Sequence, residues 1–189
     1  MENIRFEGIL ELPPIARFVP EEHYKVQLEP VSIVHISAGF LRSIEGILEE
    51  SISAAGICMQ TLQRKFDGDN LCANLHLGSY PTHLCHMYES LKGQPKGEPE
   101  LNYATRWTKT RTPSVPPLLV DRRATSFLYF DADMQPHIAR LYYYDKEKAR
   151  ESDGAVFMSF PRSGWVIAER QPGSADWAYP GERVGHYNI

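Results

Sequence analysis

Residues 33–41 read IVHISAGFL, and this stretch decides the predicted fold. Positions 33–36 form an apolar run around one histidine, which predicts a strand in the interior of a sheet. From Phe40 to Ala55, apolar residues recur at the spacing of one helix face, and Gly56 supplies a stop signal. We therefore expect an interior strand followed closely by an amphipathic helix over residues 40–55.

Strand and helix patterns extend from this unit in both directions. Residues 4–12 and 24–28 alternate apolar with polar side chains, as half-buried strands do. Residues 57–66 and 71–77 flank the turn sequence DGDN and predict a hairpin. Pro81 begins a second helix with an apolar face, and further strands are expected at 125–131, 137–144, 155–160 and 165–170. This order of elements predicts a mixed α+β fold.

Composition limits the class of protein. The chain has 189 residues, 42% of them hydrophobic, with a formal net charge of −4 and a pI near 6.0. We expect a globular protein without a transmembrane run or a signal peptide, and the acidic balance argues against a broad surface for duplex DNA. The closely placed Cys58, Cys72 and Cys85 indicate reduced thiols in a cytoplasmic compartment.

Two histidine motifs on predicted strands give the strongest chemical signal. His35 precedes Ser37 by two positions, so both side chains are expected to point to the same face of the sheet. The second motif reads Pro136-His137-Ile138-Ala139 and has no hydroxyl two positions after the histidine. An imidazole beside a hydroxyl can position a phosphate and move a proton, which predicts a phosphate-handling site.

The order of these motifs resembles the 2H phosphoesterase superfamily, whose bacterial and archaeal members are described as 2'-5' RNA ligase-like. Residues 33–41 are similar to the family's first motif, residues 75–91 to its strand-to-helix passage and residues 134–140 to its second motif. The resemblance spans most of residues 4–144. It implies one bilobal domain over residues 1–189, an α+β fold of two pseudo-symmetric lobes, each an antiparallel sheet backed by helices, facing a central groove. Residues 94–120 are then an insertion or lid.

The resemblance also implies a reaction. His35 and His137 would act as acid and base in a metal-independent phosphodiesterase that needs no cofactor and hydrolyses a 2',3'-cyclic phosphate, a 2'-5' linkage or a cyclic nucleotide. Ser37 would bind a non-bridging oxygen of the phosphate. Four further residues would hold the substrate by charge or by stacking: Arg140, Tyr142, Tyr143 and Trp165. The implied partner is an RNA end, an oligonucleotide or a cyclic nucleotide, bound by a cytoplasmic monomer without duplex DNA or a membrane.

Three alternatives stand beside this hypothesis. Ala139 occupies the position of the family's second hydroxyl, so the same fold could bind a nucleotide without turning it over. The histidines could also be incidental in a small α+β protein whose cleft binds an apolar metabolite or a partner protein. Five metal-ligating side chains are close in sequence, although strand spacing disfavours a shared zinc ion: Cys72, His76, His83, Cys85 and His86.

Overall fold

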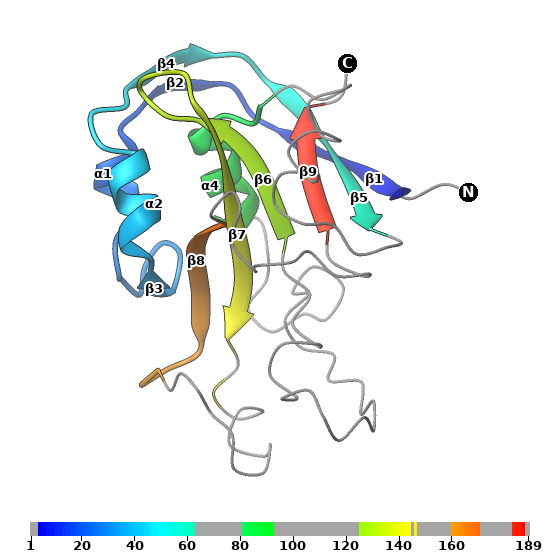
Figure 1. The fold of residues 1–189 in the computed structure, drawn as a ribbon. Coiled ribbons are helices and arrows are strands. Elements are labelled where there is room, and N and C mark those ends of the chain that lie inside the picture. Colours follow the sequence, from blue (N-terminus) through cyan, green and yellow to red (C-terminus); the bar gives the residue numbers. More distant parts are fainter. Residues whose placement is uncertain are drawn as a thin grey trace, which may run out of the picture.

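The computed structural model describes residues 4–62, 81–92, 125–144, 146, 160–170 and 183–187 (Figure 1). This part of the chain contains the helices α1 (Pro20–His23), α2 (Ala38–Ser43) and α4 (Leu84–Lys92). The strands are β1 (Ile4–Leu12), β2 (Ile15–Phe18), β3 (Ile33–Ile36), β4 (Glu49–Ile52), β5 (Ala55–Leu62), β6 (Thr125–Phe130), β7 (Pro136–Tyr144), β8 (Gly164–Arg170) and β9 (Arg183–Tyr187). The predicted mixed α+β class is confirmed, with strands predominating.

Seven of the strands form one open sheet in the spatial order β1-β5-β9-β6-β7-β8-β3. Neighbouring strands run antiparallel, except that β9 is parallel to β6 and β3 is parallel to β8. Strands from the first third of the chain therefore lie at both edges of a single sheet, and β9 lies between β5 and β6. The described residues show no division into two pseudo-symmetric lobes, and the predicted lid at 94–120 lies outside them.

A bent ribbon links the large sheet to a second sheet of two strands. β1 pairs with β5 and β2 pairs with β4, and the register is the same across the bend, with Leu12 opposite Ala55 and Ile15 opposite Ile52. Pro13 and Pro14 occupy the bend between the two strand pairs. Proline has no backbone N–H, and at the bend no hydrogen bond between strands is lost for that reason. The double proline therefore ends the first strand, as its pattern predicts.

The helix predicted over residues 40–55 is wrong in its extent. α2 ends at Ser43, and the chain then turns through Gly46, whose φ of 72° is left-handed and suits glycine. Residues 49–52 form β4 because pairing with β2 satisfies their backbone groups. Apolar residues at helical spacing thus belong to two elements: Phe40 and Ile44 are buried around α2, while Ile52 packs from β4.

Two strand predictions also differ from the structure. Residues 24–28, which follow α1, are not a strand. Their strand-like pairing is limited to the isolated bridge between Gln27 and Ile33. β3 is largely buried, yet it forms one edge of the large sheet instead of an interior strand. The strands predicted near 4–12, 125–131 and 137–144 are confirmed, whereas 71–77 and 155–159 lie outside the described residues.

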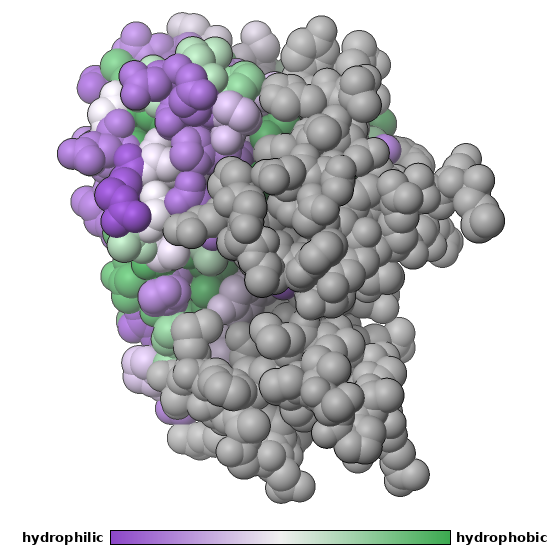
Figure 2. All heavy atoms as spheres, in the orientation of Figure 1, coloured by the Kyte–Doolittle hydropathy of each residue, from purple (hydrophilic) through white to green (hydrophobic). Residues whose placement is uncertain are grey.

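The core between the sheet and the helices is rich in aromatic side chains. Phe18, Tyr24, Phe40 and Tyr88 contact one another at ring-centroid distances of 5.1–6.2 Å, mostly edge to face. α4 buries its predicted apolar face here, and each large apolar side chain contributes about 1.5–3 kcal/mol when fully buried. On the surface, hydrophilic side chains gather over α1 and α2 (Figure 2). No helix in the described part of the chain is long and apolar enough to cross a membrane.

Candidate functional site

His35 lies on β3 and faces aromatic side chains. Its ring stacks on Phe160 with centroids 5.4 Å apart, and Phe160 in turn contacts Tyr144 edge to face. The strand register agrees with this placement. His35 lies beside Val166 of β8, and Val166 pairs with Tyr142 of β7. Tyr142 and Tyr144 are two positions apart on β7 and so point to the same face. His35 therefore belongs to the face of the sheet that carries the even-numbered residues of β7.

His137 lies on the opposite face of the same sheet, between two carboxylates. Its Nδ1 is 2.5 Å from Glu169 Oε1, and its Nε2 is 2.9 Å from Asp131 Oδ2. The ring also stacks on Tyr129 of the neighbouring strand, with centroids 5.6 Å apart. Each ring nitrogen of His137 therefore lies within hydrogen-bond distance of one carboxylate, so the imidazole is held between two acidic side chains.

The structure does not bring the two histidines together. His35 is aligned with Tyr142 across two strand spacings, and His137 precedes Tyr142 by five positions (142 − 137). At about 3.3 Å per residue and about 4.8 Å between strands, the two Cα atoms are roughly 19 Å apart. Since the side chains also point to opposite faces, they do not flank one phosphate group.

Ser37 has a local structural role at the start of α2. Its Oγ accepts hydrogen bonds from the backbone N–H of Phe40 at 3.2 Å and of Glu169 at 3.0 Å, which makes it the N-cap of the helix and ties the helix to β8. Gly39 is in contact with the Glu169 carboxylate, since a Cβ at position 39 would collide with Glu169 Oε2. Ser37 and His137 are thus linked through Glu169, a residue that the sequence motifs did not indicate.

Asp131 fixes the turn between β6 and β7. Its Oδ1 accepts the backbone N–H groups of Asp133 and Gln135 at 2.9 and 2.8 Å, while Oδ2 contacts His137. Burial acts to raise the pKa of Asp131, but the hydrogen bonds from Gln135, His137 and Asp133 hold it below its usual value. The carboxylate therefore stays charged at neutral pH in a fixed orientation.

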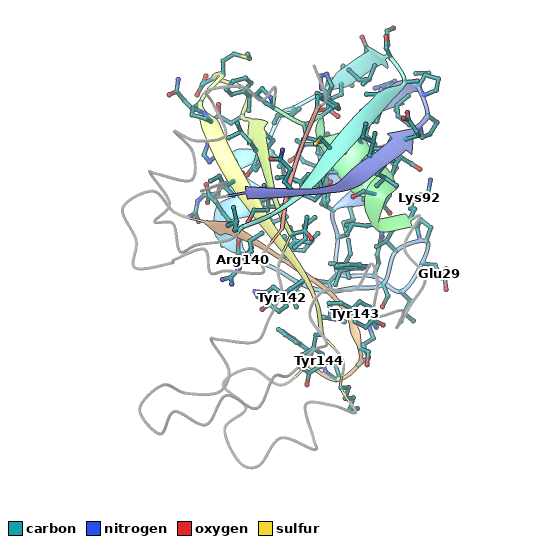
Figure 3. All side chains as sticks on the ribbon, turned by 90° about the vertical axis from the view of Figure 1, so that its right-hand side faces the viewer. Glu29, Lys92, Arg140, Tyr142, Tyr143 and Tyr144 are labelled. Atoms are coloured by element: carbon teal, nitrogen blue, oxygen red, sulfur yellow. The ribbon has the colours of Figure 1, made fainter. Side chains whose placement is uncertain are left out.

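The four residues predicted to hold a nucleotide are mostly packed into the protein. Tyr142, Tyr143 and Trp165 are buried, and Tyr143 packs edge to face on Trp165 with centroids 5.4 Å apart. Arg140 is half-buried on β7, and the consecutive residues Tyr142 and Tyr143 alternate faces of the strand (Figure 3). None of these four residues lines the cavity described below.

The described members of the disfavoured zinc cluster, His83, Cys85 and His86, lie around the start of α4. His86 is fully buried; its Nε2 lies 3.0 Å from the Pro13 carbonyl and its Nδ1 lies 2.7 Å from the Tyr187 hydroxyl, which accepts the His83 backbone N–H. Burial lowers the pKa of His86, consistent with a neutral ring that donates from Nε2. In the described part of the chain, no group of three or more His, Cys, Asp or Glu side chains is arranged to hold a metal ion, and Cys72 and His76 lie outside that part.

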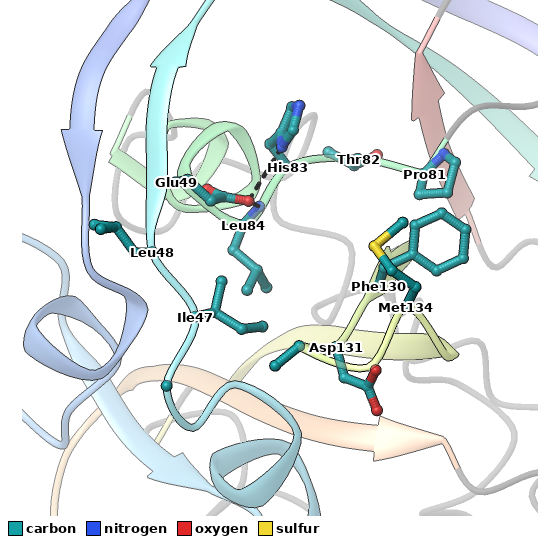
Figure 4. A pocket seen from close by; sticks show the side chains of 12 residues that line it. Ile47, Leu48, Glu49, Pro81, Thr82, His83, Leu84, Phe130, Asp131 and Met134 are labelled. Carbon is teal, nitrogen blue, oxygen red and sulfur yellow. Dashed lines mark hydrogen bonds and ion pairs between the residues drawn. The ribbon is translucent and has the colours of Figure 1, made fainter.

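A cavity of about 460 Å³ opens between the segment leading into β4, the start of α4 and the β6–β7 turn (Figure 4). Ile47 and Leu84 lie on one side of the close-up and Phe130 and Met134 on the other, so much of the wall is apolar. The volume is in the range of small-molecule sites. Asp131, whose carboxylate contacts His137, is among the residues that line this cavity.

Glu49 is the second carboxylate of the cavity wall. Its oxygens accept hydrogen bonds from the backbone N–H groups of Leu84 and Cys85 at 2.8 and 2.7 Å, so this residue of β4 caps the N-terminus of α4. Its Oε1 also lies 3.2 Å from His83 Nδ1, the contact drawn as a dashed line in Figure 4. Burial acts to raise the pKa of Glu49, but these hydrogen bonds outweigh it and hold the pKa below its usual value.

The described lining of this cavity is acidic and includes one buried hydroxyl. The lining residues in the described structure include Glu49 and Asp131 but no lysine or arginine. Thr82, which also lines it, is 2% exposed, and its Oγ1 has no hydrogen-bond partner among the described residues. A buried hydroxyl without a partner is unfavourable by about 1–3 kcal/mol.

Comparisons of the chain with protein-family models, with curated proteins and with solved structures found no match. The resemblance to 2H phosphoesterases thus depends on the motifs around His35 and His137. The site must therefore be interpreted from its own geometry.

Proposed function

We propose that this protein is a small-molecule-binding protein and that its ligand occupies the cavity between β4, α4 and the β6–β7 turn. The observation that carries the proposal is the cavity itself, of about 460 Å³, whose lining combines apolar side chains with the acidic residues Glu49 and Asp131. Apolar pockets with a few oriented polar groups are the usual form of small-molecule sites.

Binding is better supported than phosphodiester hydrolysis. The two-histidine reaction needs both imidazoles within hydrogen-bonding reach of one phosphate. The register places His35 and His137 on opposite faces of the sheet, and Ser37 is engaged as a helix cap. The phosphodiesterase hypothesis therefore stays a prediction without support from this geometry, and the metabolite-binding alternative agrees with it.

A ligand screen with two matched tryptophan variants tests the proposal. Ala132 is exposed and lines the cavity, so Ala132→Trp should obstruct it without disturbing the core. Gln135 is an exposed residue of the same turn that does not line the cavity, so Gln135→Trp is the control. A thermal-shift screen of a fragment library should give compounds that stabilise the wild type and Gln135→Trp but not Ala132→Trp.

The size of the effect follows from mass action. A ligand at one hundred times its Kd adds about 2.7 kcal/mol, which raises the Tm of a domain of this length by about 5–10 °C. If no fragment stabilises the wild type, or if every stabilising fragment acts equally on Ala132→Trp, the cavity is not a binding site and the proposal fails.

A further inference from the structure

We propose that His86 is an acid-sensitive latch: its neutral ring holds the cavity wall at residues 81–84 in place, and protonation of the ring releases that wall. The latch joins segments that are distant in sequence. His86 is fully buried on α4, and its two ring nitrogens contact the Pro13 carbonyl at the β1–β2 bend and the Tyr187 hydroxyl on β9. This inference goes beyond the proposed function, because it concerns the wall itself and needs no ligand.

The contacts of the His86 ring match one neutral form of the imidazole. A backbone carbonyl only accepts hydrogen bonds, so Nε2, 3.0 Å from the Pro13 oxygen, carries a proton and donates it. Nδ1 is then the acceptor of the neutral ring, and it lies 2.7 Å from the Tyr187 hydroxyl. Burial raises the pKa of Tyr187, so this hydroxyl keeps the proton that it donates to Nδ1. A second proton on the ring would place a charge in the interior, which is unfavourable.

The Tyr187 hydroxyl connects the ring to the cavity wall. It accepts the backbone N–H of His83 at 2.9 Å while it contacts His86 Nδ1. Figure 4 shows the segment from Pro81 to Leu84 along one side of the cavity, and all four of its residues line the cavity. A protonated Nδ1 cannot accept the hydroxyl proton, so the hydroxyl has to reorient. Protonation of His86 therefore weakens the contact that holds His83 in the wall.

The titratable groups around His86 do not offset its burial. Burial lowers the pKa of His86, and the neighbouring His83 ring, with its centroid 6.3 Å away, acts in the same direction. The Pro13 carbonyl and the carboxylates of Glu49 on β4 and Glu89 on α4 act to raise it, but the net direction is down. His83 is the other titratable group of the wall, and its side chain is 45% exposed and contacts Glu49. The test must therefore separate His86 from His83.

The pH range of the latch follows from this direction. A histidine with a lowered pKa in the folded state does not oppose folding above its unfolded value of about 6.5. Below that value, an opened state in which His86 contacts water binds a proton that the closed state resists. If the closed ring stays neutral, the opening equilibrium shifts by about 30-fold between pH 7.5 and pH 5.0.

Backbone amide hydrogen exchange, followed by NMR at pH 7.5 and pH 5.0, measures the release of the wall. Protection factors remove the intrinsic pH dependence of exchange and so report the opening equilibrium. In the wild type, we expect the protection of the residue 83 amide to fall by about tenfold or more at pH 5.0 and to stay below that of the β7 amides.

Two glutamine variants identify the group that responds to acid. His86→Gln keeps a donor and an acceptor at this position but cannot be protonated, so the fall in protection should be less than about twofold. His83→Gln is the matched control, because it removes the other titratable ring of the wall. We expect His83→Gln to respond to acid as the wild type does.

The wild-type ring and Tyr187→Phe keep the test decisive even if His86→Gln does not fold. Nitrogen chemical shifts of the wild-type imidazole should show a neutral ring with its proton on Nε2 at pH 7.5. Tyr187→Phe retains the ring but removes the hydroxyl that accepts the His83 N–H. The protection of the residue 83 amide should therefore already be lower by about fivefold or more at pH 7.5.

Several results would overturn the latch. An equal fall in the wild type and His86→Gln, or loss of the response in His83→Gln, would assign the acid response to another group. A ring that is charged at pH 7.5, or unchanged protection in Tyr187→Phe, would contradict the contacts on which the inference depends. If the residue 83 amide is as protected as the β7 amides at pH 5.0, the wall opens only on global unfolding and there is no latch. None of these measurements involves a ligand, so the fragment screen decides the proposed function separately.

Discussion

Removing the carboxylate of Glu49 should destabilise the protein by about 3 kcal/mol, because this side chain caps α4 from a distant strand. Glu49→Ala leaves the N–H groups of Leu84 and Cys85 without their acceptor, and both residues are at most 1% exposed, so water has little access to them. Hydrogen bonds to charged groups contribute about 1.5–3 kcal/mol each, and helix caps contribute about 0.5–2 kcal/mol. Two such hydrogen bonds amount to about 3–6 kcal/mol, so the predicted loss lies at the lower end of that range and above the range for helix caps.

Urea denaturation followed by circular dichroism measures this loss, and thermal unfolding should show a Tm lower by about 6–12 °C. Glu49→Gln retains one oxygen for a backbone N–H, so we expect about half the loss. Glu50 is the exposed neighbour on β4, and Glu50→Ala should change stability by less than about 0.5 kcal/mol. A Glu49→Ala protein as stable as Glu50→Ala would refute the capping argument.

The stability difference between the wild type and Glu49→Gln should depend on pH, because the pKa of Glu49 is lowered in the folded state. A carboxyl group with a lower pKa in the folded state contributes stability that is fully present above its unfolded value of about 4.3. That contribution is lost as the pH falls through the folded pKa. The difference in stability between the wild type and Glu49→Gln should therefore be constant above about pH 5 and shrink below about pH 4. A difference unchanged down to pH 2.5 would contradict this assignment.

Two further predictions concern the histidines. Tyr187→Phe removes the hydroxyl that joins the His83 N–H to the buried His86 ring, and urea denaturation should show a loss of about 1–2 kcal/mol. With chelator present, we expect neither the wild type nor His35→Ala to hydrolyse 2',3'-cyclic nucleotides or 2'-5' oligoadenylates; turnover that disappears in both His35→Ala and His137→Ala would instead restore the acid–base hypothesis.

Elements whose structure is decided by their own residues could be predicted from the sequence. β1 shows its alternation and β7 its apolar run directly, and the apolar face of α4 is apparent from the spacing of Leu84, Tyr88 and Leu91. Segment 40–55 could not be predicted in this way, since its apolar spacing is compatible with a helix. The pairing of β4 with β2, made possible by the turn at Gly46, is a tertiary contact that the local pattern does not contain.

The candidate site was harder to predict than the fold because its members meet through strand register. Asp131, His137 and Glu169 are on three different segments, and only the pairing of β7 with both β6 and β8 places the two carboxylates on either side of the ring. The register also separates His35 from His137. The sequence motif around His137 therefore indicated a residue with specific polar contacts. Which residues it contacts could be learned only from the strand pairing of the folded sheet.

His137 connects the cavity to the rest of the fold, and this gives its motif an explanation that does not involve catalysis. Asp131 holds the turn and lines the cavity, His137 joins it to Glu169, and the backbone of Glu169 is bound by the Ser37 cap of α2. Each contact fixes the next, so the orientation of the cavity carboxylate depends on a chain of hydrogen bonds that crosses β7 and β8. In this arrangement, Ser37 and His137 fix the orientation of Asp131 through Glu169, so both residues have structural contacts that need no reaction.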